Sequence, residues 1–254
     1  MEKLAQNKTA PGRYALLDEL RGLDLVSMML YHACWDLAFL FGVEMKWYAA
    51  TPGHLWQQSI CWVFILLSGF CVPLGHHTLR RGATVFGAGV LVTAVTLLFM
   101  PEDRVVFGVL TLLGSAMLLT GLLEPLLKKV PPAVGLAVAA VLFALTYHAA
   151  DHYLGIGALR LALPESLYAN YFTAYLGFYP CWFYSTDYFP LVPWLFLFWC
   201  GYFLHGVVGC TRMEPLRRSV CAPLGWIGRH SLVLYLLHQP VIFGVLWVIF
   251  QIFH

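Results

Sequence analysis

The residues best suited to chemistry lie in the first long apolar stretch, LDELRGLDLVSMMLYHACWDLAF, at 17–39. Its ionisable side chains include Arg21, Asp24, His32 and Asp36. At 100° per residue these four fall within about 120° of one another on a helix. Ionisable groups are costly in hydrocarbon and mark functional candidates inside a span. We therefore expect one polar face leading to His32 and Asp36. Alternatively, Asp18, Arg21 and Asp24 form a structural ion-pair cluster at the helix end.

The last apolar stretch offers a partner for His32. In IGRHSLVLYLLHQPVIF, residues 227–243, one helical face carries Ser231, Tyr235 and His238. His32 and His238 follow basic residues by similar numbers of positions, so we expect both near the middle of the membrane. Imidazole titrates near neutral pH and suits a general base. Alternatively, His238 only satisfies backbone groups that Pro240 frees.

The composition indicates the environment of these residues. Hydrophobic residues make up 60% of the 254-residue chain and charged residues only 11%, against about 25% charged in soluble domains. The chain is predicted to be an integral membrane protein in the lipid bilayer. No basic stripe is interleaved with aromatics, so nucleic acid is not an expected partner. The seven scattered cysteines are typical of small core residues, and no metal site is expected.

Apolar runs divide the chain into about seven spans, because crossing a bilayer takes roughly 20 helical residues. The predicted spans are 20–42, 56–75, 83–100, 105–125, 132–150, 189–209 and 230–252. The fold class is therefore an all-α polytopic helical bundle forming one domain, 1–254. The aromatic-rich stretch 151–188 is an interfacial loop, a re-entrant element or an eighth short span, and we favour an extracytoplasmic loop.

Charge placement predicts the orientation. With a cytoplasmic N-terminal segment, 1–15, all but three of the 15 Lys and Arg residues lie inside. The three outside are Lys46, Arg104 and Arg160. The positive-inside rule therefore favours N-in and C-out, and an eighth span would move the basic residues of 212–229 to the wrong side. The sequon at Asn7 would then be cytoplasmic, and no cleavable signal peptide is expected.

Several blocks resemble one family. LDELRG followed by Met28, Met29 and His32 is similar to the LDxxRG…M…H opening of the heparan-α-glucosaminide N-acetyltransferase catalytic family. Four further blocks resemble the family in its order: FILLSGFCVPLG (64–75), FGVLTLLGSAMLL (107–119), YFPLVPWLFLFWCG (188–201) and IGRHSLVLYLLHQP (227–240). Thr111 stands where family members often have His.

This resemblance implies an acyltransferase of the bacterial cytoplasmic membrane. It would move an acetyl group from cytoplasmic acetyl-CoA to an amine or hydroxyl of an extracytoplasmic sugar or glycan. His32 is the first candidate for the general base or acyl relay and His238 the second, while Asp36 orients a histidine or binds a sugar amine. A homodimer is left open.

The resemblance also implies binding residues. Ser231, Tyr235 and Trp35 are candidate donors to the thioester oxygen. The CoA phosphates need cations at the cytoplasmic mouth, and the candidates are Arg21, Arg80, Arg81, Arg217, Arg218 and Arg229. Asp18 is a further candidate for binding the substrate or CoA. His54 is the nearest counterpart of a loop histidine in the lysosomal member of the family and is the candidate on the acceptor side.

Two other functions remain open. Polar faces on two spans could line a pathway in a transporter or flippase of a sugar or acyl lipid. Histidines on separate spans could also ligate a haem. A third pattern, His148 and His152 with Asp151 between them, is either a metal site or, as we favour, a set of interfacial polar residues.

Overall fold

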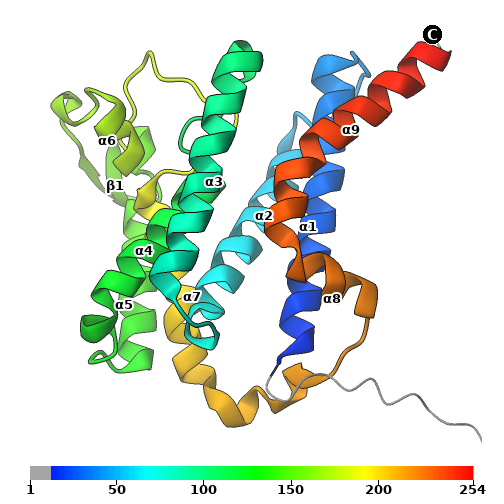
Figure 1. Ribbon diagram of the computed structural model, residues 1–254. Helices are drawn as coiled ribbons and strands as arrows, with labels where there is room; N and C mark the ends of the chain where they lie inside the picture. Colours follow the sequence, from blue (N-terminus) through cyan, green and yellow to red (C-terminus); the bar gives the residue numbers. More distant parts are fainter. Residues whose placement is uncertain (1–12, 254) are drawn as a thin grey trace, which may run out of the picture. The chain divides into compact units, whose positions relative to one another are not determined.

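A computed structural model describes residues 13–253, and Figure 1 shows its helices and a small hairpin. The long helices are α1 (Ala15–Trp35), α2 (Thr51–Phe70), α3 (Thr78–Phe99), α4 (Val109–Leu127), α5 (Pro132–Thr146), α7 (Leu191–Arg212) and α9 (Ser231–Phe253). The shorter elements are β1 (Tyr153–Ile156), β2 (Leu159–Ala162), α6 (Tyr171–Leu176) and α8 (Ala222–Arg229). The sequon at Asn7 and the predicted segment 1–15 up to residue 12 lie outside the described residues.

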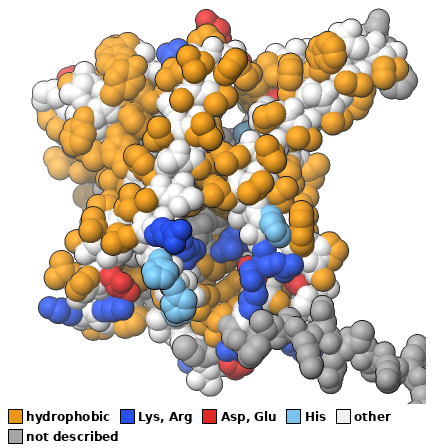
Figure 2. Space-filling model, viewed as in Figure 1, with side chains coloured by type: hydrophobic (Ala, Val, Ile, Leu, Met, Phe, Trp, Pro, Cys, Tyr) orange, Lys and Arg blue, Asp and Glu red, His pale blue; other side chains and the backbone are white. Residues whose placement is uncertain are grey.

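The prediction of a polytopic helical membrane protein with seven spans is confirmed. Seven helical segments in the described part of the chain are long and apolar enough to cross a membrane. They are Ala15–Leu40, Thr51–Leu74, Thr78–Phe99, Val109–Leu127, Pro132–Asp151, Leu191–Gly209 and Ser231–Ile252. Hydrophobic side chains cover much of the surface in Figure 2, as expected where lipid is the solvent. The N-in orientation stays a prediction.

The chain divides into two compact units. The first comprises the described residues up to Cys61 and those from Val208 onward. Here α1 packs against α8 and α9 (Figure 1). Its core is formed by Leu25, Met28 and Ile60, with Tyr31, Trp56, Ile227, Leu234 and Tyr235 among the side chains packed around them. The first and last spans therefore belong to one unit.

Close backbone contact joins α1 to α8. Gly22 on α1 lies against the Leu224 carbonyl, and Gly228 on α8 lies against the Asp18 carbonyl. A Cβ at either glycine would overlap backbone atoms that no side-chain rotation can move. This approach brings the short helix beside the polar start of α1, so small residues here serve helix packing in the way common to membrane proteins.

The second unit covers Trp62–Val207. Its helices α3 and α4 pack together, and another cluster buries Ala139, Cys200 and Phe203. The aromatic-rich stretch 151–188 folds into the antiparallel hairpin β1–β2, with Gly155 paired to Arg160, followed by α6. No helix in this stretch reaches spanning length. One aromatic side chain of this stretch is also tied to the backbone just beyond the C-terminal end of α5: the Tyr168 hydroxyl donates to the Ala149 carbonyl at 2.5 Å.

We expect Gly22→Ala to lower the free energy of unfolding by about 1–3 kcal/mol, the usual cost of overpacking. The reason is that the new methyl group would meet the Leu224 carbonyl. Gly244→Ala on α9 is the matched control, since a Cβ there meets nothing within 4 Å. Thermal unfolding of both variants in the same detergent compares them. Equal unfolding temperatures would contradict the close α1–α8 contact.

Candidate functional site

Two histidines from separate spans meet inside the first unit. His32 projects from α1 and His238 from α9, with ring centroids 4.8 Å apart and ring planes inclined by 59°. The Tyr235 ring lies one turn before His238 on α9, at 5.3 Å from the His238 ring. His238 is 8% exposed. The structure thus brings together His32, His238 and Tyr235, three of the residues singled out in the sequence.

Asp36 lies beside this pair and is fully buried. At this residue α1 widens into the π-helical turn η1 (Asp36–Leu40), a feature that often occurs at functional sites. The Gln239 side-chain amide on α9 donates from Nε2 to Asp36 Oδ1 at 2.5 Å. Gln239 was missed as a functional residue. Its place directly after His238 was the available signal, but the sequence pattern alone did not pair it with Asp36.

Three buried polar atoms around this contact lack a hydrogen-bond partner among the described residues. They are Asp36 Oδ2, His238 Nε2 and Gln239 Oε1. Buried polar atoms in native proteins are almost always paired, so such a group requires an explanation. The Gln239 amide oxygen is an acceptor and never a donor. The same holds for Asp36 Oδ2 when the carboxyl group is ionised. These atoms therefore suit a bound group that brings hydrogen-bond donors.

The backbone determines which nitrogen of His238 carries its proton. His238 Nδ1 lies 2.5 Å from the Tyr235 carbonyl oxygen. A carbonyl can only accept, so we assign the proton of the neutral ring to Nδ1, and Nε2 then carries a lone pair. Proline at 240 would free the carbonyl four residues earlier, that of Leu236. If His238 only satisfied the backbone group that Pro240 frees, its ring would bond the Leu236 carbonyl. The ring bonds the Tyr235 carbonyl instead.

At its Ala15 end, α1 carries Asp18, an acidic group with two arginine partners. Asp18 Oδ2 lies 2.6 Å from Arg13 Nε, and Asp18 Oδ1 lies 3.5 Å from Arg21. The hydrogen bond to Asp18 raises the pKa of Arg13, so this guanidinium stays charged. Asp24 is outside these ion pairs, and its Oδ2 has no hydrogen-bond partner in the described part of the chain. The alternative of a three-member cluster therefore fits Asp18 and Arg21 but not Asp24.

Glu19 connects α1 to the segment that precedes α8. Its Oε1 accepts from the Ser219 hydroxyl at 2.5 Å, and its Oε2 accepts from the Val220 N–H at 2.9 Å. Glu19 is 4% exposed. A buried carboxylate that receives these donors is satisfied without a counter-ion. Glu19 therefore has a structural role that its position in the apolar stretch did not reveal.

The remaining predicted site residues lie at other positions along the helices, with contacts of their own. The Trp35 ring packs on Phe39 with centroids 5.6 Å apart. Ser231 is the half-buried first residue of α9, and exposed Arg229 ends α8. His54 is exposed in the first turn of α2. Arg80 and Arg81 are exposed near the start of α3, which belongs to the second unit.

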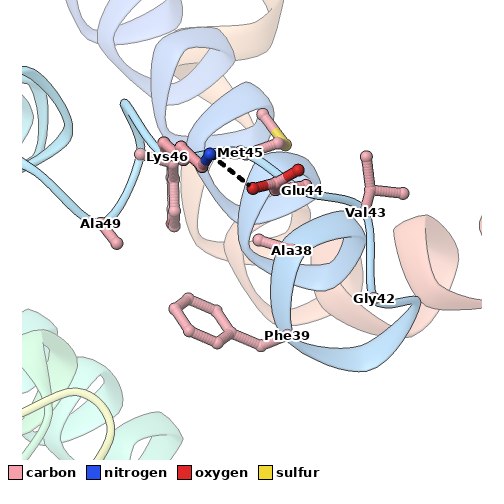
Figure 3. Close-up of a pocket in the computed structure, with 9 residues that line it drawn as sticks. Ala38, Phe39, Gly42, Val43, Glu44, Met45, Lys46 and Ala49 are labelled. Carbon is pink, nitrogen blue, oxygen red and sulfur yellow. Dashed lines mark ion pairs between the residues drawn. The ribbon is translucent and has the colours of Figure 1, made fainter.

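A shallow pocket of about 310 Å³ follows the π-helical turn. Figure 3 shows Phe39 on its wall and the ion pair of Lys46 Nζ with Glu44 Oε1, 2.9 Å apart, on its rim. Tyr48 also lines the pocket and donates from its hydroxyl to the Tyr31 carbonyl at 3.1 Å. Burial raises the pKa of Tyr48, which keeps this donor protonated. The pocket was missed because no motif marks the connection 41–50.

His148 and His152 make separate contacts and do not share a partner in these contacts. His148 Nδ1 lies 2.8 Å from Asp151 Oδ2, while the His152 ring stacks on Tyr168 at 3.7 Å between centroids. Within residues 13–253, no group of three or more His, Cys, Asp or Glu is arranged to hold a metal ion. The His148 ring also stacks on Tyr153 of β1, with centroids 4.8 Å apart, so both histidines pack against aromatic rings in the hairpin region.

Comparison with known protein families gives a match that covers most of the chain. The family model described as heparan-alpha-glucosaminide N-acetyltransferase, catalytic, matches residues 13–240. No curated protein and no solved structure matches the chain. The matched range includes both histidines, Asp36 and Gln239.

We expect Glu19→Ala to lower the free energy of unfolding by about 1–3 kcal/mol, because Ser219 and Val220 lose their acceptor. The segment around Ser219 should also become more sensitive to protease. Glu44→Ala is the matched control, since exposed ion pairs contribute at most about 1 kcal/mol. Limited proteolysis and thermal unfolding in detergent measure both effects. Unchanged proteolysis around Ser219 would contradict the role assigned to Glu19.

Proposed function

The chain belongs to the heparan-α-glucosaminide N-acetyltransferase catalytic family, and from this premise we propose a specific reaction for it. The protein is a membrane acetyltransferase that takes its acetyl group from acetyl-CoA on the cytoplasmic side. The acceptor is an amine or hydroxyl of a sugar or glycan on the other side. The membrane is the cytoplasmic membrane of a bacterium, with the N-terminus inside.

One observation carries this proposal: two imidazoles and a buried carboxylate meet inside a pair of spans. The His32 and His238 rings are 4.8 Å apart, and Asp36 is held by Gln239 from the same helix as His238. Acyl transfer across a membrane needs a base at a depth that both donor and acceptor can reach. Ionisable groups at such a depth are costly and are typically retained for function.

The proposed reaction is an attack by the acceptor nitrogen or oxygen on the thioester carbonyl carbon. A histidine takes the proton that the nucleophile loses. The carbon–sulfur bond then breaks, and the sulfur of CoA leaves as a thiolate that takes up the proton held by that histidine. His32 acts as the general base or as a relay that carries the acetyl group, and His238 is the alternative for either role.

The unpaired acceptors favour an amine over a hydroxyl. Asp36 Oδ2, His238 Nε2 and Gln239 Oε1 all lack donors among the described residues. A hydroxyl brings one donor, whereas the neutral amine that attacks the thioester brings two. Asp36 would therefore bind the amine while a neighbouring imidazole takes its proton. The family description, which names a glucosaminide, agrees with an amino sugar as the acceptor.

Arginines would bind the phosphates of CoA at the cytoplasmic end. Arg21 is the best placed in the first unit, because Asp18 lies 3.5 Å away and orients it. Asp18 is itself an anion and would repel a phosphate, so its proposed role is to position Arg21. Arg229, Arg80 and Arg81 are exposed and remain further candidates. Tyr235, next to His238, is the best placed of the proposed donors to the thioester oxygen.

We expect His32→Ala to lower the rate of acetyl transfer by at least about 100-fold, since general base catalysis typically contributes 10²–10⁴-fold. The measurement is transfer of label from acetyl-CoA to a panel of amines and glycans in proteoliposomes. His76→Ala, at an exposed position before α3, is the control. A folded His32→Ala variant with full activity would remove His32 from the mechanism. No transfer by the wild-type protein to any acceptor would count against the enzyme.

We expect Arg21→Gln to raise the KM for acetyl-CoA by about 10-fold, since a hydrogen bond to a charged group is lost. The kcat should change much less. Arg160→Gln on the exposed strand β2 is the matched control, with no expected effect on that KM. An unchanged KM combined with lower stability would instead assign Arg21 to the structural ion pair with Asp18.

A further inference from the structure

Gln239 and Asp36 form a direct side-chain contact between α9 and α1. Gln239 Nε2 donates to Asp36 Oδ1 at 2.5 Å, and the two residues are 203 positions apart in the chain. Asp36 is fully buried, and Gln239 is half-buried. The contact lies next to the pair formed by His32 and His238.

The chemistry of an amide determines how Gln239 is oriented in this contact. An ionised carboxylate only accepts hydrogen bonds, so the NH₂ group of Gln239 must face Asp36. The opposite orientation would bring two acceptor oxygens together. As a result, the second carboxylate oxygen, Asp36 Oδ2, and the amide oxygen, Gln239 Oε1, are both buried without a partner among the described residues.

This arrangement differs from a contact that serves stability alone. A purely structural amide would leave few polar atoms unpaired, because buried unsatisfied groups are unfavourable. Here one oxygen of Asp36 is held and the other is left open, and the adjacent His238 leaves Nε2 open as well. The π-helical turn that begins at Asp36 also places this carboxylate where α1 departs from regular geometry.

We propose that Gln239 is a positioning residue for acetyl transfer. It fixes the Asp36 carboxylate through Oδ1 so that Oδ2 can bind a donor of the acceptor substrate beside His238 Nε2. This inference rests on the proposed function and adds to it a residue that acts through Asp36. Its effect should appear on the acceptor and on kcat, and it should be absent from the binding of acetyl-CoA.

A double-mutant cycle tests the proposal in the full-length protein in proteoliposomes. Gln239→Met keeps the length of the side chain and removes its donor. We expect it to lower kcat/KM for an amino-sugar acceptor by about 10- to 100-fold, as for loss of a hydrogen bond to a charged group. The KM for acetyl-CoA should stay the same. Gln251→Met, the same change at an exposed position of α9, should be neutral.

The second half of the cycle uses Asp36→Leu. If Gln239 acts through Asp36, adding Gln239→Met to Asp36→Leu should cause no further loss, because the two residues form one unit. Losses that multiply would overturn the proposal, as would a Gln239→Met variant that lowers thermal stability but keeps full kcat/KM.

A measurement without turnover separates this inference from the proposed function. In protein with ¹⁵N-labelled glutamine side chains, the Gln239 amide resonance, assigned by its loss in Gln239→Met, should shift in Asp36→Leu. The Gln251 amide should not shift. No shift at Gln239 would overturn the inference even if the enzyme is active. A wild-type protein that transfers no acetyl group would instead overturn the proposed function, and with it the catalytic role of Gln239, while the shift would still establish the contact.

Discussion

Hydrocarbon does not solvate charge, and this constraint explains how the first span is held. Asp18 is matched by guanidinium groups and Glu19 by the donors of Ser219 and Val220. Asp36 receives an amide from α9. Much of this matching comes from the C-terminal part of the chain, so the polar face of α1 and the packing of the first unit depend on each other.

The histidine pair combines structure and chemistry in one side chain. One nitrogen of His238 bonds the Tyr235 carbonyl, and this contact fixes both the ring and its proton. The other nitrogen is left open. A role in satisfying the backbone and a role in proton transfer are therefore compatible. The two oxygens of Asp36 differ in the same way. Oδ1 accepts from Gln239, whereas Oδ2 has no hydrogen-bond partner among the described residues.

The spans and the histidine pair could be predicted because both follow from position along a helix. Apolar length defines the seven spans, and similar distances from basic residues placed His32 and His238 at similar depth. Gln239 could not be paired with Asp36 in this way, because a π-helical turn changes which direction a side chain takes. The partners of Glu19 escaped prediction because they lie in a connecting segment whose path has no sequence period.

The contact between Asp36 and Gln239 has a consequence for biosynthesis. Five of the candidate spans lie between α1 and α9 in the described part of the chain, so a ribosome makes Asp36 long before it reaches Gln239. Throughout that interval the newly inserted helix holds a carboxyl group in the bilayer without its amide partner. The first span must therefore be tolerated by the insertion machinery as an incomplete segment, and the contact between Asp36 and Gln239 forms only when α9 docks against α1.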